Sequence, residues 1–345
     1  MSSTFFFIIL RTRKRITLAI TDKFKDKRIV IVGDAVADQF VSGTITRVSR
    51  EAPVFIMRHD KTETRAGGAA NAAVNVASLG GTPFLIGLIG TDADGDLVAA
   101  ELEKRGVNTS LIVRSSEIRT TTKMRVLAGQ QYAPRHQVIR IDHENTAEIG
   151  LETRKQLADN LSAAAETADA IVVSDYNYGV ATPEIFNQAR QAAAQNNIPL
   201  LIDSRFRLGS FVGATSATPN QEEVEQMIGG PMTDERCEKI RTDLGLQALL
   251  VTYGNKGMRL YESGAAPHII EAVGSSAAVD VTGAGDTVIA AYALGLASGL
   301  SFIDSARIAN HAGGIVVMKK GTASVVAAEL NAALGAESLG TAKAR

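Results

Sequence analysis

A glycine-rich turn that ends in an aspartate is the part of the sequence best suited to catalysis. The turn reads DVTGAGD over residues 280–286, and the apolar stretch that follows predicts a helix at 287–296. Glycines before a helix allow backbone amides to converge on an anion, and the helix N-terminus adds partial positive charge. We expect Asp286 to be the base for an attacking hydroxyl. A helix cap with glycines for tight packing is the structural alternative. The amides expected to hold a transferring phosphoryl group belong to Gly283, Ala284 and Gly285.

A second glycine motif, GGAAN at residues 67–71, opens a helix rich in small residues that extends to Leu79. The adjacent Gly67 and Gly68 allow the backbone to turn close to a ligand. Asn71 offers both a hydrogen-bond donor and an acceptor to sugar hydroxyls. Close packing of a helix on a sheet explains the same residues. The motif therefore indicates a ligand site only in combination with the glycine turn at residues 280–286.

The elements that must position these motifs alternate between strands and helices. Continuous apolar runs predict buried parallel strands at residues 28–34, 170–175, 199–203 and 248–252. Helical stretches lie at residues 97–105, 153–167, 183–194 and 234–244. This alternation predicts an α/β fold with a doubly wound sheet and helices on both faces. Ligands bind beyond the carboxyl ends of such strands. The polar residues at those ends are Asp34, Asp175, Asp203 and Thr252.

Three other segments carry strand-forming residues without helices between them, at 54–58, 120–127 and 138–142. They predict a small antiparallel sheet that stands off the main domain as a lid or dimer surface. We expect a single domain over residues 27–333, with the lid inserted at about 41–64 and 118–143. Residues 1–26 are interpreted as a loose N-terminal extension and residues 334–345 as a C-terminal tail.

The composition excludes several classes of function. With 36 basic and 37 acidic residues among 345, the balance favours neither nucleic acid nor an anionic membrane as a partner. The single cysteine, Cys237, allows no intrachain disulfide, so a cytoplasmic location is expected. The short apolar run at residues 5–10 precedes its basic cluster, which is the reverse of a secretory signal. Neither a P-loop motif nor a dinucleotide-binding Gly-x-Gly-x-x-Gly motif occurs.

The two glycine motifs resemble the two signatures of the PfkB family of ribokinase-like carbohydrate kinases. Residues 66–90 resemble the first signature, with paired glycines, Asn71 and further glycines at positions 80 and 90. Residues 280–293 resemble the second, which includes the Gly-Asp pair that ends at Asp286. The resemblance extends over residues 28–330. It implies an ATP-dependent sugar kinase with a mostly parallel sheet, helices on both faces and a small β-sheet lid.

The resemblance also implies roles for matching positions. The turn that ends at Asp286 resembles the family's anion hole and catalytic base. Asn220 and Glu223 resemble a motif that organises Mg²⁺ and phosphate, with the metal held largely through water. A helix start with solvated acids is the alternative for these two residues. Asp280 and Thr282 match positions at which many relatives bind a monovalent cation, which implies K⁺. Positions that resemble the ATP-binding loop and the adenine site are Thr252, Gly254, Gly257 and Asn310.

Within the family, several short segments of the sequence are most similar to the D-glycero-D-manno-heptose 7-phosphate kinases of lipopolysaccharide-precursor synthesis. The similar segments are residues 33–38, 49–54, 121–127, 139–142 and 174–176. Asp34 and Asp38 are expected to bind sugar hydroxyls, because carboxylates accept strong hydrogen bonds. Lys123, Arg125 and Arg140 are candidates for the distal phosphate of the substrate, although solvated lid charges explain each one alone.

The sequence departs from those relatives near the expected sugar site. They carry a lysine shortly after Ser-Asp-Tyr, where this sequence has Asn177 and Tyr178, and Asp-Pro-Lys where it has an Asp-Ser-Arg run that ends at Arg205. We expect Arg205 to replace the missing cation, because a guanidinium can bind phosphate through two parallel bonds. A solvent-facing arginine is the alternative.

The predicted reaction is transfer of the γ-phosphate of MgATP to O1 of the heptose 7-phosphate, giving a 1,7-bisphosphate. A ribokinase- or fructokinase-type kinase for another sugar, or a sugar-binding relative without turnover, is the alternative. A homodimer is expected to pair the exposed edges of the lid. The nucleotidyltransferase domain often fused to such kinases has no counterpart here, so a separate protein is expected to supply that step.

Overall fold

The main sheet of the computed structural model has eight strands. The structure describes residues 20–145, 148–275 and 277–343, with side chains described as far as residue 335. All neighbouring strands are parallel except the two pairs that join β12, β13 and β14. In sheet order the strands are β14 (His268–Ile270), β13 (Met258–Glu262), β12 (Ala248–Thr252), β11 (Ser216–Ala217), β10 (Leu200–Ser204), β9 (Ala170–Asp175), β1 (Arg28–Gly33) and β4 (Thr82–Ile86).

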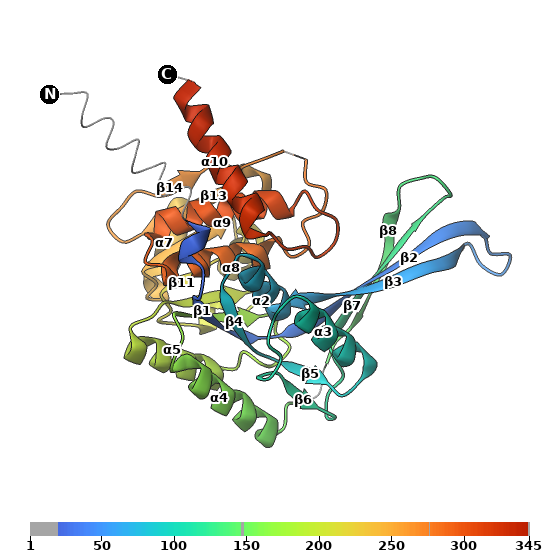
Figure 1. The fold of residues 1–345 in the computed structure, drawn as a ribbon, viewed down its shortest axis with the longest axis horizontal. Helices are drawn as coiled ribbons and strands as arrows, with labels where there is room; N and C mark the ends of the chain where they lie inside the picture. The colour runs from blue at the N-terminus through green and yellow to red at the C-terminus, as the bar shows by residue number, and fades with distance from the viewer. Residues whose placement is uncertain (1–19, 146–147, 276, 344–345) are drawn as a thin grey trace.

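Helices cover both faces of this sheet, because alternate residues of each strand point to opposite sides. In β1, Ile29 and Ile31 pack in one core cluster while Val30 and Val32 pack in the other. Figure 1 shows α2 and α8 on one side of the sheet and α4 and α5 on the other. The first core includes α2 (Ala69–Ser78), α3 (Ala93–Lys104), α8 (Ala284–Ala297), α9 (Phe302–Val316) and α10 (Ala327–Lys343). The second includes α4 (Leu151–Ala165), α5 (Pro183–Asn196), α6 (Gln221–Ile228) and α7 (Asp234–Asp243). The predicted doubly wound α/β fold is confirmed.

The lid is a four-stranded sheet that projects from the main domain (Figure 1). Its strand order is β3 (Phe55–Gly68), β2 (Ala35–Val48), β7 (Thr122–Gly129) and β8 (His136–His143). The central pair β2–β7 is parallel, so the prediction of a purely antiparallel lid is wrong for that pair. The 14-residue strand β2, which a single residue separates from β1, was not predicted as a strand. A separate small pair is formed by β5 (Leu88–Gly90) and β6 (Val113–Ser115).

The ends of the described chain belong to the fold. Ile20 and Phe24 lie in the first core, and a short 3-10 helix (Thr21–Lys23) precedes β1. The predicted loose extension over residues 1–26 is therefore wrong for residues 20–26, since their apolar side chains are buried; residues 1–19 lie outside the described residues. Helix α10 continues through Lys343, where a tail was predicted from residue 334. In the part of the chain that the structure describes, no helix is both long and apolar enough to cross a membrane.

Candidate active site

The glycine turn places Asp286 in the first turn of α8. Gly283 precedes the helix with a φ of 77°, a conformation that residues with a Cβ rarely adopt. A Cβ on Gly283 would also lie 2.5 Å from Asn71 Nδ2, so both the backbone and the close packing require glycine. The first amides of α8 have no acceptor within the helix itself. The amide of Ala284 donates to the carbonyl of Val281 at 3.2 Å, which leaves the next amides of the turn as the better anion donors.

Asp286 is buried, and both of its carboxylate oxygens accept hydrogen bonds. Asn71 Nδ2 donates to Oδ2 at 2.8 Å, and the hydroxyl of Tyr176 donates to Oδ1 at 2.8 Å. Burial raises the pKa of Asp286 to about 7, against the lowering effect of these two donors. The nearby Asp38 raises this pKa further and Lys123 lowers it. A carboxyl group that titrates near neutral pH, at a helix N-terminus, is suited to take a proton from a hydroxyl.

Asp34, predicted to bind sugar, holds the loop that carries Tyr176. Its carboxylate accepts three backbone amides, from Tyr176 at 2.9 Å, Tyr178 at 3.0 Å and Val180 at 3.0 Å. Burial raises the pKa of Asp34 against the effect of these donors. In the structure this residue organises the loop after β9, and its contact with sugar hydroxyls stays a prediction.

Asp175 also has its oxygens engaged by protein groups. It pairs with the Arg207 guanidinium and accepts hydrogen bonds from Ser204 Oγ at 2.7 Å and from the amide of Asn177 at 3.0 Å. Arg207 also donates to the carbonyl of Ala181 at 3.0 Å. These contacts fix the carboxyl ends of β9 and β10 together. The predicted substrate contact of Asp175 stays a prediction.

Asp38 lies on β2 beside the paired glycines. Its Oδ1 pairs with Arg125 at 2.6 Å, and its Oδ2 accepts a hydrogen bond from Thr322 Oγ1 at 2.7 Å. A Cβ on Gly67 would lie 2.7 Å from Asp38 Oδ2, so the glycine gives this carboxylate its space. A Cβ on Gly68 would lie 2.5 Å from the carbonyl oxygen of Asp34. The two glycines therefore allow the end of β3 to pack closely against Asp34 and Asp38, where the lid joins the main domain.

The cations of the predicted phosphate site lie in different surroundings. Lys123 on β7 is buried, with its Nζ over the rings of Tyr176 and Tyr178, 5.3 and 5.5 Å from their centroids. Arg205 is exposed and lies over the Tyr176 ring at 5.8 Å. Burial and the charge of Arg205 lower the pKa of Lys123. Arg140 on β8 instead forms two hydrogen bonds, both 2.9 Å, with the carboxylate of Asp142.

Asp203 lies beside the glycine turn, and Glu223 is close enough to Asp203 to act on it electrostatically. Burial and then the charge of Glu223 raise the pKa of Asp203 well above its usual range, and Asp286 adds to this. A Cβ placed on Gly285 would lie 4.0 Å from Asp203 Oδ2, which sets the carboxylate beside the turn. Asn220 caps α6: its Oδ1 accepts the Glu223 amide at 2.9 Å, and Glu223 Oε2 accepts the Asn220 amide at 2.9 Å. Among the described residues, no group of three or more His, Cys, Asp or Glu is arranged to hold a metal ion directly.

The predicted nucleotide residues lie along the edge that follows β12. Thr252 ends β12, and Gly254 and Gly257 both have positive φ, of 56° and 89°. A Cβ on Gly257 would lie 2.0 Å from the carbonyl oxygen of Ile270. Asn310 on α9 donates through Nδ2 to the Glu271 carbonyl at 2.7 Å, which ties the helix to the segment directly after β14. Asn310 is on α9, which packs in the same core as α8, the helix that follows the glycine turn.

The predicted cation position is a closed loop of hydrogen bonds. Asp280 Oδ1 accepts the amide of Thr282 at 2.9 Å, and its Oδ2 accepts the amide of Gly321 at 2.9 Å. Burial raises the pKa of Asp280, but the backbone amides outweigh it and the net shift is downward. The carboxylate is therefore ionised, and it joins the glycine turn to the loop before α10.

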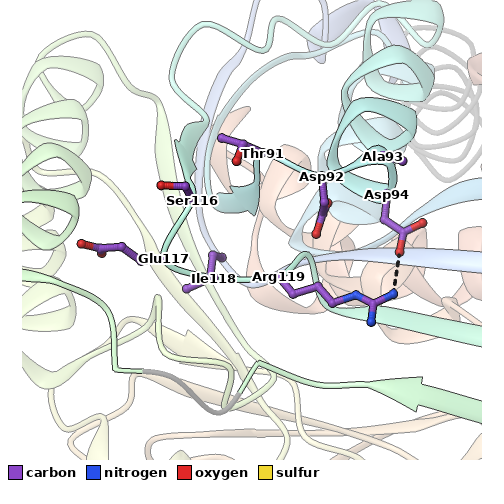
Figure 2. Close-up of a pocket in the computed structure, with 8 residues that line it drawn as sticks. All are labelled: Thr91, Asp92, Ala93, Asp94, Ser116, Glu117, Ile118 and Arg119. Carbon is purple, nitrogen blue, oxygen red and sulfur yellow. Dashed lines mark ion pairs between the residues drawn. The ribbon is translucent and has the colours of Figure 1, made fainter.

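Helix α3 anchors the lid next to the site residues. Asp94 accepts hydrogen bonds from Gln39 Nε2 at 2.7 Å and from Thr122 Oγ1 at 3.0 Å, which are the neighbours of Asp38 and Lys123 in sequence. Figure 2 shows Asp94 with its ion-pair partner Arg119 at the edge of a cavity of about 610 Å³. A change in this anchor would shift two strands at the positions that carry site residues.

The comparisons with known proteins agree with this geometry. Residues 26–328 match the pfkB family carbohydrate kinase. The chain belongs to this family. It is 40% identical over 314 residues to the D-beta-D-heptose 7-phosphate kinase of Bordetella bronchiseptica, covering 88% of this chain and 95% of that relative. It is 38% identical over 315 residues to the bifunctional protein HldE of Citrifermentans bemidjiense, covering 89% of this chain but only 63% of that relative.

Solved structures of carbohydrate kinases share the fold of this pfkB-family chain. Phosphofructokinase-2 from Escherichia coli in complex with potassium gives a TM-score of 0.72 at 19% identity, covering 90% of this chain and 99% of that one. Ribokinase from Arabidopsis thaliana, complexed with ribose and ATP, gives 0.67 at 22% identity, covering 90% and 99%. At these identities the likeness concerns the fold. The assignment to the pfkB carbohydrate kinase family comes from the family match over residues 26–328 and not from this likeness.

Sequence reasoning missed several residues of the candidate site. Tyr176 lies in a family-like segment of the sequence that gives it no role of its own, yet it contacts the carboxylate of Asp286. Arg207 and Thr322 hold Asp175 and Asp38 from distant parts of the chain. Asp203 was placed at a strand end without a role. The position of Asp203 at the end of a parallel strand was a usable signal, whereas Thr322 lies 284 residues from its partner and had none.

Proposed function

We propose that this kinase transfers the γ-phosphate of MgATP to O1 of D-glycero-D-manno-heptose 7-phosphate. The observation that carries the substrate is the 40% identity over nearly the whole length of a relative named D-beta-D-heptose 7-phosphate kinase. The structure supports it with two cations, Lys123 and Arg205, that meet at the ring of Tyr176. Their mutual repulsion would be relieved by an anion, and a sugar phosphate supplies one.

The proposed chemistry is assigned to residues of this chain. Asp286 takes the proton of the sugar hydroxyl, oriented by Asn71 and Tyr176. The first-turn amides of α8 stabilise negative charge on the transferring phosphoryl group. This arrangement needs the hydroxyl and the phosphoryl group on the same side of the turn, because base and amides belong to one helix end.

The acidic residues of the site fit a magnesium ion that is held mostly through water and phosphate oxygens. Asp203 and Glu223 lie close enough for one charge to raise the pKa of the other, and a divalent cation would offset that repulsion. Mg²⁺ would supply charge neutralisation on the phosphates of ATP. We assign the adenine side to Thr252, Gly254, Gly257 and Asn310. We assign a monovalent cation, K⁺, to the carboxylate and backbone around Asp280 and Thr282.

A screen of sugars and sugar phosphates by coupled ADP release tests the substrate. Heptose 7-phosphate is expected to be used with the highest kcat/KM, and phosphorus NMR of the product is expected to show a second phosphate on O1. A wild-type preference for an unphosphorylated pentose or hexose would overturn the heptose phosphate assignment and leave the kinase assignment standing.

We also propose that the kinase is a cytoplasmic homodimer joined through the lid. The lid exposes large apolar side chains, including Phe55, Val138, Ile139 and Ile141, at 64%, 50%, 53% and 41% of their full areas. Exposed strand edges with apolar side chains tend to pair with another chain. Light scattering at micromolar concentration is expected to give the mass of two chains. A stable monomer would contradict the proposal.

A further inference from the structure

Tyr176 touches both halves of the site at once. Its hydroxyl donates to Asp286 Oδ1 at 2.8 Å, while its ring lies 5.3 Å from Lys123 Nζ and 5.8 Å from the Arg205 guanidinium. Its backbone amide is held by Asp34 at 2.9 Å, so the residue is fixed at the main chain. A Cβ on Gly68 would lie 3.4 Å from the ring, which limits the room on that side. A single side chain therefore bridges the base and the cations of the proposed phosphate site.

We propose that Tyr176 is a positioning residue through which the cations that bind the substrate's phosphate orient the base Asp286. This inference rests on the proposed function for its phosphate. A cation over an aromatic face is attracted to the ring, so a shift of Lys123 or Arg205 toward a bound phosphate changes the force on the ring. Because the ring carries the hydroxyl that holds Asp286, the change reaches the base.

The phenol acts only as a donor in this arrangement. Burial raises the pKa of Tyr176 well above its usual range, and the negative charges of Asp286 and Asp203 raise it further, against the lowering effect of Arg205. The hydroxyl therefore stays protonated at working pH and takes no proton from the sugar. Its hydrogen bond lowers the pKa of Asp286. The other ionisable groups that face Asp286 are Asp38 on β2, Lys123 on β7 and Asp203 on β10.

Tyr178 offers a matched control two residues away. Its ring also lies over Lys123, at 5.5 Å, but its hydroxyl donates to Glu144 at 3.0 Å instead of to the base. Tyr176→Phe and Tyr178→Phe each remove one hydroxyl and keep the ring. Only the first is expected to change the base.

The first measurement needs no substrate. The melting temperature of each protein is recorded against pH together with that of the same protein carrying Asp286→Asn. The difference within each pair stops changing at the folded-state pKa of Asp286. This pH is expected to be higher in Tyr176→Phe than in the wild type and unchanged in Tyr178→Phe. An unchanged pH in Tyr176→Phe would overturn the proposal.

The second measurement is a double-mutant cycle on kcat, run with the sugar that the wild type phosphorylates. Arg205→Ala is expected to lower kcat about 3-fold or more in the wild type and in Tyr178→Phe, but not in Tyr176→Phe, where the link is already broken. Equal losses in all three backgrounds would overturn the coupling. If the wild type uses no heptose 7-phosphate, the proposed substrate fails, while the substrate-free measurement still decides whether Tyr176 controls the base.

Discussion

The candidate site has two contrasting parts. In the first, called here the core wall, Asp286 is 3% exposed, and side chains from α2 and from the loop after β9 donate hydrogen bonds to its two oxygens. The second part, called here the lid-facing wall, is formed by Lys123 of β7 and Arg205 of the loop after β10. Lys123 contacts aromatic rings, and Arg205 is open to solvent. In the first wall both oxygens of the base already have partners, whereas the second carries two like charges whose repulsion an anion would relieve. The proposed function therefore places the chemistry in the core, and substrate choice in the lid and its neighbouring loops.

The largest expected effect comes from the base. Asp286→Asn should lower kcat by roughly 10²–10⁴, because proton abstraction from the sugar hydroxyl is lost. The amide keeps the size of the side chain and a polar group in the first turn of α8, so the fold should persist. Steady-state kinetics give kcat, and calorimetric titration gives ATP affinity, which should change little. A variant with near wild-type kcat would remove Asp286 from the mechanism and erase the contrast between the walls.

The lid-facing wall should respond in binding more than in turnover. Arg205→Ala should weaken a phosphorylated sugar by about 1.5–3 kcal/mol, the usual contribution of hydrogen bonds to charged groups. The KM for ATP should hardly change, because the proposal assigns Arg205 to the phosphate of the sugar. Arg307→Ala, on the exposed part of α9, is the control and should change neither KM. Equal sugar KM values for wild type and Arg205→Ala would place the phosphate elsewhere.

The anchor between the walls should give an intermediate effect. Asp94→Asn replaces one acceptor oxygen by a donor and so loses a hydrogen bond from Gln39 or Thr122. With the neighbours of Asp38 and Lys123 displaced, the sugar KM should rise about 10-fold with a smaller change in kcat. Asp96→Asn, two residues further along α3, loses only a surface pair with Arg114 and serves as the control. A rise in KM for both variants would point to general damage of the helix.

The smallest effect is on stability and belongs to the core wall alone. The folded-state pKa of Asp286 is about 7, and the ordinary value of the carboxyl is 3.8. Between these values the folded protein binds more protons than the unfolded chain, so stability falls as pH rises from about 4 to 7 and is constant above. Relative to Asp286→Asn, the melting temperature of the wild type should fall by roughly a few degrees across this range. A flat difference would mean that the base is ionised throughout.

Much of the main domain could be predicted from the sequence, because buried parallel strands are continuous apolar runs. The strand at Ala248–Thr252 has the predicted bounds, and that at Ala170–Asp175 does as well. The strand β2 was missed because its 14 residues mix buried and exposed positions and include glycine, serine and threonine. Its pairing with β7 depends on contacts about 85 residues away, which no local pattern contains.

For the site, the sequence predicted positions better than partners. The glycine turn and Asp286 stand out in the sequence because the proposed chemistry would need that spacing. Asp34 and Asp175 were predicted to face the sugar, but in the structure their oxygens accept hydrogen bonds from nearby loops. A carboxylate at a strand end can bind a ligand or can accept hydrogen bonds from the loops that surround it, and the sequence pattern is the same in both cases. Only coordinates show which groups it contacts.

The direct passage from β1 into β2 has a mechanical consequence. Asp34, the one residue between these strands, accepts hydrogen bonds from three backbone amides. It is therefore a fixed point about which the long strand that follows would rotate. At about 3.3 Å per residue, the 14 residues of β2 form an arm of roughly 45 Å, with Asp38 about 13 Å from the pivot. A rotation of about 5° would carry the far tip by roughly 4 Å and Asp38 by only about 1 Å. A force on the far tip of β2 would thus act through a long lever, and a large displacement of the tip would correspond to a small displacement of Asp38.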